Sequence, residues 1–157
     1  MIFLKVNMTR RIIPLRFCKS KVPLVTFGLA DNDELYYAII DTGSEISIIN
    51  DSLRSKIKTK EIDAETNLVG VNGGTGYRNL TQGVCNLVFN DLNEESVSAV
   101  VGGMVSDLKA ISSHFKNKND EYIPIAIIIG GDFLKHYNAK INYRNKTLTI
   151  DVEEELT

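Results

Sequence analysis

The clearest pattern in the sequence is an apolar run that stops at a carboxylate and resumes beyond a turn. Residues 34–40 end in a series of apolar side chains, Asp41 follows directly, and residues 46–49 return to an apolar, alternating pattern. A strand, a tight turn on a glycine and a second strand are therefore predicted. A carboxylate between two buried strands is costly unless N–H groups or a shared proton compensate it, so Asp41 is the first candidate for a functional residue.

Most of the remaining pattern also predicts β-structure. Short apolar strands are expected at residues 11–17, 22–29, 96–104 and 123–129, and a closing hairpin is expected to join residues 139–143 to 147–152. Helical segments are expected at residues 52–56, at 105–115 through the stripe Val105, Leu108, Ile111 and Phe115, and at 132–137. Asp132 is expected to be the N-cap of the last helix.

A cluster of glycines, Asn72-Gly73-Gly74-Thr75-Gly76, lies between the strand-like residues 67–71 and 77–88. This composition is typical of a hairpin tip that needs positive φ at several positions. A phosphate-binding loop is the competing interpretation. It is disfavoured because strand-like sequence follows the glycines and no Lys-Ser/Thr pair or G-x-G-x-x-G spacing is present.

Length and charge narrow the class of protein. A chain of 157 residues with a net charge of -2 is most simply one domain, and its interspersed charges offer no broad basic field for nucleic acid. Two distant cysteines, Cys18 and Cys85, and two histidines, His114 and His136, lack the spacing of metal ligands. We therefore expect no metal and no cofactor.

The amino terminus is apolar, but Lys5 and Asn7 interrupt it, so no signal peptide is expected. No run approaches the roughly 20 apolar residues that would cross a bilayer. The sequence thus predicts a cytoplasmic protein with neither membrane nor nucleic acid as a partner.

Two motifs together carry a resemblance to a known family. Asp41-Thr42-Gly43-Ser44 after its apolar run, and Ile127-Ile128-Ile129-Gly130-Gly131-Asp132 about ninety residues later, resemble the retropepsin-like aspartic proteases of retroviruses, retroelements and bacteria. The resemblance covers residues 21–152, with 1–20 as an N-terminal extension or interface strand and 153–157 as an acidic tail. It implies a mainly β fold: a closed acid-protease barrel with a flap hairpin and one or two short helices.

The resemblance also implies roles for individual residues. Asp41 would be catalytic, Thr42 would bond across a dimer axis, the Gly43 N–H would approach the carboxylate, and Ser44 would bond the outer oxygen of Asp41. A mobile flap over the substrate would consist of Val71, Asn72, Gly73, Gly74, Thr75 and Gly76. The active-site loop would be supported by Ile128, Ile129 and Gly130.

The chemistry requires a second carboxyl group. Hydrolysis of a peptide without a metal or covalent nucleophile needs one carboxylate to accept a proton from water and a carboxylic acid to hydrogen-bond the carbonyl oxygen. The chain holds one Asp-Thr-Gly, so the pair must be Asp41 and its mate in a homodimer, where two-fold symmetry brings identical residues together. The expected function is an aspartic endopeptidase acting on polypeptides.

Three other interpretations stay open. The chain could be a non-catalytic dimerisation or peptide-binding module that keeps the scaffold. Residues 127–131 could form a strand–helix junction of an unrelated α/β fold, or Gly130-Gly131 could belong to a nucleotide-binding domain, although the mainly β pattern disfavours both. The sequence also leaves open whether the helical insertion at residues 105–120 lies over the substrate cleft or on the outside of the sheet.

Overall fold

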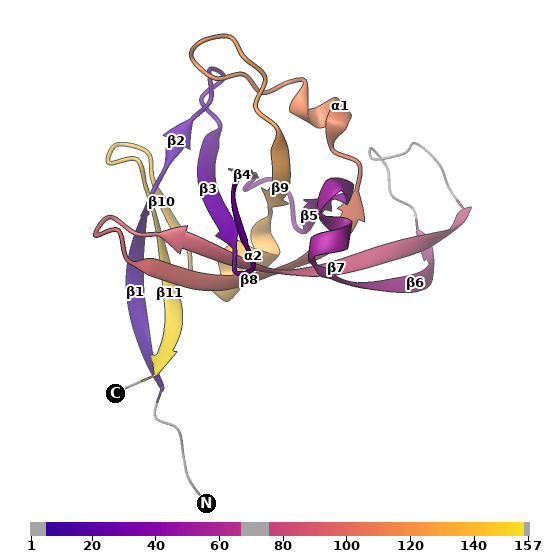
Figure 1. Ribbon diagram of the computed structural model, residues 1–157, viewed down its shortest axis with the longest axis horizontal. Helices are drawn as coiled ribbons and strands as arrows, with labels where there is room; N and C mark the ends of the chain where they lie inside the picture. Colours follow the sequence, from indigo (N-terminus) through magenta and orange to yellow (C-terminus); the bar gives the residue numbers. More distant parts are fainter. Residues whose placement is uncertain (1–5, 67–75, 156–157) are drawn as a thin grey trace, which may run out of the picture.

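The structure is a computed structural model that describes residues 6–66 and 76–155, and it consists mainly of β-strands (Figure 1). Six strands close into a barrel, because β3 pairs with β4 on one side and with β7 on the other. In order around the barrel they are β3 (Pro23–Leu29), β4 (Asn32–Ile40), β9 (Ile125–Ile129), β5 (Ser47–Asn50), β8 (Ser96–Ser106) and β7 (Gly76–Asn90). The mainly β, closed barrel predicted from the sequence is confirmed.

The other elements flank this barrel. β2 (Arg16–Phe17) extends the sheet beside β3, and β6 (Lys58–Thr66) extends it beside β7. A separate three-stranded sheet has the order β1 (Val6–Pro14), β11 (Thr147–Glu155) and β10 (Lys140–Asn142). The short helices are the 3-10 helix η1 (Asp51–Lys56) and the α-helices α1 (Lys109–Ser112) and α2 (Gly131–His136).

Side chains at alternate strand positions fill the barrel. In β4, Ala38 and Ile40 belong to the interior cluster, whereas Ile39 packs in a second cluster on the opposite face. Ile127 and Ile129 of β9 likewise point inwards and are fully buried. Each buried isoleucine contributes about 1.5–3 kcal/mol of burial free energy, which fixes the register of β4 and thereby the place where Asp41 leaves the strand.

The second cluster lies on the outer side of β3, β4, β9 and β5, and the insertion after β8 covers it. Leu108, Ile111 and Phe115 of the insertion pack there together with Ile39 of β4 and Ile128 of β9. The insertion therefore lies on the outward face of the barrel wall that carries Asp41.

The helix predicted over residues 105–115 is wrong in length. β8 continues through Ser106 because its last residues pair with β5, with Val105 opposite Ile49, and only residues 109–112 become helical. The helical spacing of the apolar positions arises because Val105 packs on the interior cluster while the later positions pack on the outer one.

The first twenty residues, expected as an extension or interface strand, pack on the body of the chain as far as they are described. β1 pairs with β11 along its whole length, and the two run side by side toward the chain ends in Figure 1. Ile13 and Leu15 are buried in the interior cluster. At the other end, Glu153 and Glu154 of the expected acidic tail are part of β11 and lie opposite β1.

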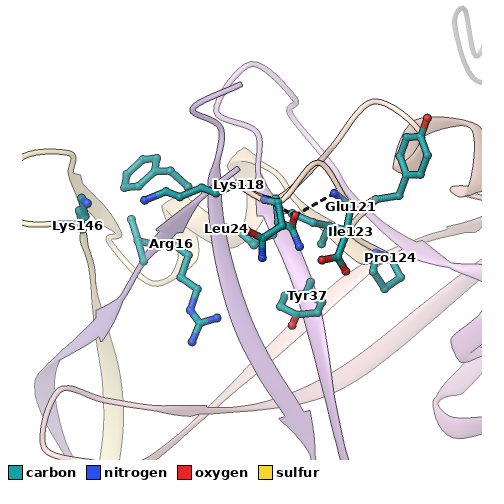
Figure 2. A pocket seen from close by; sticks show the side chains of 13 residues that line it. Arg16, Leu24, Tyr37, Lys118, Glu121, Ile123, Pro124 and Lys146 are labelled. Carbon is teal, nitrogen blue, oxygen red and sulfur yellow. Dashed lines mark hydrogen bonds between the residues drawn. The ribbon is translucent and has the colours of Figure 1, made fainter. Parts of the chain in front are cut away.

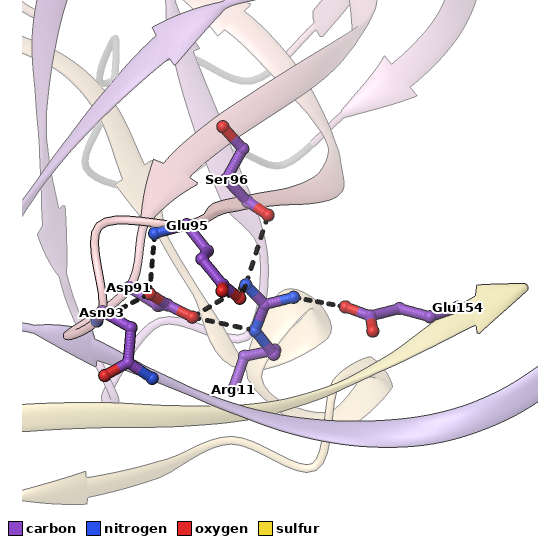
Figure 3. A network of polar contacts seen from close by, with 6 residues as sticks. All are labelled: Arg11, Asp91, Asn93, Glu95, Ser96 and Glu154. Atoms are coloured by element: carbon purple, nitrogen blue, oxygen red, sulfur yellow. Dashed lines mark hydrogen bonds and ion pairs between the residues drawn. The ribbon is translucent and has the colours of Figure 1, made fainter.

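A partly buried charge network links this terminal sheet to the turn between β7 and β8 (Figure 3). The Arg11 guanidinium donates to Asp91 at 2.7 Å and also to Glu154, while the backbone N–H groups of Asn93 and Glu95 donate to the other Asp91 oxygen. The Glu95 N–H and the Arg11 guanidinium lower the pKa of Asp91 below its ordinary value.

We expect the protein to lose stability as the pH falls through the lowered pKa of Asp91, and an Asp91→Asn variant to lose less over the same range. The folded state binds the Asp91 proton more weakly than the unfolded chain does, so the ionised carboxylate stabilises the fold above about pH 4, and this contribution disappears below the folded pKa. Urea unfolding at about pH 7 and pH 3 measures the difference. Asp120→Asn is the control, because Asp120 forms an exposed ion pair with Lys19. Equal acid sensitivity of the Asp91 variant and the parent would contradict the assignment.

Candidate active site

Asp41 lies directly beyond the end of β4, where the backbone stays paired with β9. Its N–H donates to the carbonyl of Ile129 at 2.9 Å, which continues the parallel pairing of Ile40 with Ile129 by one residue. The Asp41 side chain is exposed although the three residues before it are buried. Buried strand residues therefore hold the backbone at Asp41 while its carboxylate remains accessible.

The turn after Asp41 is closed by its own backbone. The Gly43 N–H donates to Asp41 Oδ1 at 3.1 Å, and the Ser44 N–H donates to the Asp41 carbonyl at 3.2 Å. An added Cβ on Gly43 would lie 3.4 Å from the same Asp41 oxygen, an ordinary contact. The N–H of Gly43 thus supplies a compensating hydrogen bond for the carboxylate.

The first residues of α2 form hydrogen bonds with the chain that follows Asp41. The Gly131 N–H donates to the Ser44 carbonyl at 2.7 Å, and the Asp132 N–H donates to the Glu45 carbonyl at 3.0 Å. Gly130 lies so close that an added Cβ would meet the carbonyl oxygen of Ile46 at 2.3 Å. Gly130, one of the residues expected to support this loop, and the adjacent Gly131 are therefore in direct contact with the chain that follows Asp41.

Asp132 is not the N-cap that the sequence predicts. The N-cap of α2 is Gly130, and Asp132 lies in the first turn. Its Oδ1 accepts a hydrogen bond from the Ser47 hydroxyl at 2.6 Å and its Oδ2 accepts one from the Ser47 N–H at 3.0 Å. The Gly130 N–H in turn donates to Ser47 Oγ at 2.9 Å. Asp132 and Ser47 thus tie the start of β5 to α2.

The structure also places the other residues singled out in the sequence, as far as it describes them. Ser44 Oγ donates to the carbonyl of Ile46 at 2.7 Å, so in the single chain its hydroxyl is directed to the backbone and not to the outer oxygen of Asp41. The Thr42 side chain is exposed. Ile128 pairs with β5 and belongs to the outer cluster, beside Ile129 in the interior. Of the predicted flap, Val71, Asn72, Gly73, Gly74 and Thr75 lie outside the described residues, and Gly76 begins β7.

The two thiols do not offer an alternative nucleophile. Cys18 and Cys85 are both buried, and burial raises the pKa of the Cys85 thiol to about 11. A thiol is nucleophilic as the thiolate, which such a pKa keeps scarce near neutral pH. The accessible carboxylate at residue 41 is the better candidate for chemistry.

Replacing Ser47 by alanine should cost about 1–3 kcal/mol of unfolding free energy, because the buried Gly130 N–H would lose its acceptor. Chemical denaturation of the variant measures the loss. Ser98→Ala provides the matched control, since Ser98 is exposed on β8 and its substitution should stay within roughly 0.5 kcal/mol of the parent. If the two variants were equally stable, the proposed structural role of Ser47 would be contradicted.

Sequence reasoning missed both Ser47 and Asp132 as partners. The available signal was a hydroxyl residue at the head of an apolar strand, Ser47-Ile48-Ile49, and an acidic residue two positions after Gly130. Nothing local links them, because they are separated by 85 positions along the chain.

Solved structures resemble the overall fold of this chain. The chain resembles the crystal structure of a retropepsin-like aspartic protease from Rickettsia conorii, with a TM-score of 0.50 over 99% of this chain and 100% of that chain, at 12% sequence identity. It also resembles the retroviral protease-like domain of Ddi1 from Leishmania major, with a TM-score of 0.44 over 87% of this chain and 94% of that chain, at 19% identity. Neither a protein-family model nor a curated protein sequence matches it. The resemblance expected from the sequence is confirmed at the level of the fold, which is retropepsin-like.

Within the described part of the chain, no helix has the length and apolar character that crossing a membrane would require.

Proposed function

We propose that the protein is an aspartic endopeptidase that hydrolyses polypeptides as a homodimer. The observation that carries the proposal is the accessible Asp41 carboxylate at the end of a buried strand, on a turn that the Gly130–Asp132 segment holds by hydrogen bonds. The carboxylate is accessible, accepts the Gly43 N–H, and is carried by a loop whose backbone is fixed by hydrogen bonds, which suits a reacting group better than a packing residue.

Two copies of Asp41 supply the complete reaction. One carboxylate accepts a proton from the attacking water, while the other, as a carboxylic acid, hydrogen-bonds the substrate carbonyl. The water oxygen bonds to the carbonyl carbon, and the C–N bond then breaks as the carboxyl pair returns a proton to the leaving amine. Two carboxyl groups held close together do not ionise independently, so they share one proton in the resting dimer.

The dimer is a requirement of the proposal, because each chain supplies one Asp-Thr-Gly turn. A two-fold axis beside Asp41 would place its mate across the axis and Thr42 within reach of the partner turn. The flap role of residues 71–76 belongs to the same proposal.

Digestion of an unfolded polypeptide at acidic to neutral pH, with and without the transition-state isostere pepstatin, tests the proposal. We expect fragments in the absence of the inhibitor and their loss in its presence. Intact polypeptide after incubation with a dimeric preparation would instead favour the non-catalytic module. Sedimentation in the same buffer adds a second criterion: full activity from a monomer would contradict the shared pair of carboxyl groups.

A further inference from the structure

A pocket of about 580 Å³ opens on the outer side of the barrel, between β2 and the loop that precedes β9. Figure 2 shows Lys146 and Arg16 on one side of it, Glu121 and Pro124 on the other, and Lys118 between them. Tyr37 of β4 lies on the barrel wall between these two sides. The loop belongs to the insertion whose helix packs on the outer cluster, so the pocket is built partly from the segment that extends the barrel.

The charge of the pocket lining is unbalanced toward cations. Arg16, Lys118 and Lys146 line it, against the single carboxylate of Glu121. Within residues 6–66 and 76–155, the side chains of these three cations form no salt bridge and no hydrogen bond, whereas the nearby Asp120 is already paired with Lys19. The pocket therefore presents positive charge to solvent without a partner in the described chain.

Aromatic groups complete the lining. Phe17 and Tyr37 are both partly buried there, and the Tyr37 hydroxyl has no hydrogen-bond partner among the residues that the structure describes. A phenol hydroxyl can donate to a carboxylate, and the rings can pack on the aliphatic part of an acidic side chain.

The pocket lies on the same face of β4 as the candidate active site. Side chains at positions 37, 39 and 41 share one face of an extended chain, and Ile39 is in the outer cluster as this alternation requires. The hydrogen bond from the Asp41 N–H to the Ile129 carbonyl continues the pairing of β4 with β9 as far as Asp41. Four residues of strand correspond to about 13 Å at roughly 3.3 Å per residue.

We propose that this pocket binds the carboxylate side chains of acidic residues in the polypeptide substrate, at a position removed from the bond that is cut; as a substrate site, it rests on the proposed function. An extended peptide also rises about 3.3 Å per residue, and it must pass over the insertion that covers Ile39, so the preferred acidic residue lies at least about four residues from the scissile bond. A two-fold dimer carries one pocket per chain, which gives the preference on both sides of that bond.

Cleavage of paired peptides tests the substrate preference. We compare kcat/KM for a peptide with Glu at the fourth position on each side of a cleavable bond and for the same peptide with Gln there. An exposed ion pair changes affinity roughly 1.5- to 5-fold, so several together should favour the Glu peptide about tenfold, with a smaller ratio at high salt. The ratio should fall toward one in the triple variant Arg16→Gln, Lys118→Gln, Lys146→Gln.

Binding measured in the Asp41→Asn background separates this inference from the proposed function, because it needs no turnover. Fluorescence anisotropy of the labelled Glu peptide should show tighter binding than the Gln peptide, and the triple variant should remove the difference. Lys135→Gln is the control, since Lys135 is exposed on α2 and does not line the pocket.

Each outcome decides one of the two proposals. Equal binding of both peptides, or a preference that survives the triple variant, overturns the acidic site even if peptides are cleaved. A preference that depends on the three cations supports the site, and if the parent enzyme then cuts neither peptide, the proposed peptidase function is the part that fails.

Discussion

Replacing Asp41 by asparagine should reduce peptide hydrolysis by about 10²- to 10⁴-fold or more while leaving the fold intact. General acid–base catalysis by a positioned group typically supplies a factor of this size, and asparagine can neither accept the proton of water nor share one with its mate. The side chain is exposed, and its hydrogen bond from the Gly43 N–H can be accepted equally by an amide oxygen. Turnover of an unfolded polypeptide and thermal unfolding are measured on the same preparation.

Asp33→Asn is the matched control for this variant. Asp33 is also an exposed aspartate of the same hairpin, but it lies at the start of β4, at the opposite end of the strand from Asp41. It should retain the parent activity. Equal activity of the Asp41 and Asp33 variants would exclude the carboxyl-pair mechanism, and a large loss of stability in the Asp41 variant would indicate a structural carboxylate.

Replacing Gly130 by alanine should disturb both the fold and the loop that carries Asp41. The new Cβ would lie 2.3 Å from the Ile46 carbonyl oxygen and 3.0 Å from the Ser44 carbonyl oxygen, and both obstacles are backbone atoms. Overpacking of this kind typically lowers the free energy of unfolding by about 1–3 kcal/mol. Here the steric clash can be relieved only if the loop after Asp41 moves. We therefore expect both lower stability and strongly reduced turnover.

Gly28→Ala in β3 controls for the change from glycine to alanine itself. There the nearest atom to an added Cβ is 3.8 Å away, which is ordinary contact. The unfolding free energy and the rate of peptide turnover of this variant should both be close to those of the parent. If the Gly130 variant matches it in both measurements, the contact between the α2 turn and the active-site loop has been misassigned.

The sequence predicts the centre of this structure because the relevant patterns are local. The apolar run before Asp41 and the near-continuous run before Gly130 each indicate a buried strand, and both strands are observed beside one another. β6 was missed, since its residues 58–66 are rich in charged side chains. Those charges suit a strand paired on one side only.

Contacts between distant segments account for the remaining differences. The bond from Ser47 to Asp132 and the pairing of β1 with β11 join residues that no local pattern connects. The helix expected from residue 105 is shortened because pairing with β5 outweighs a weak helical propensity. The hydrogen-bond partners of polar residues often lie in distant segments of the chain, so their roles are harder to predict from the sequence than the burial of apolar residues.

The most direct test of the central claim uses mixed dimers. Parent chains and Asp41→Asn chains are denatured, combined in different ratios and refolded together, and peptide turnover per total protein is measured. If both Asp41 residues of a dimer are required, activity follows the square of the parent fraction, so an equal mixture retains about one quarter of the parent activity. Activity proportional to the parent fraction, with about one half retained in the equal mixture, would show that each chain works alone and would contradict the shared pair.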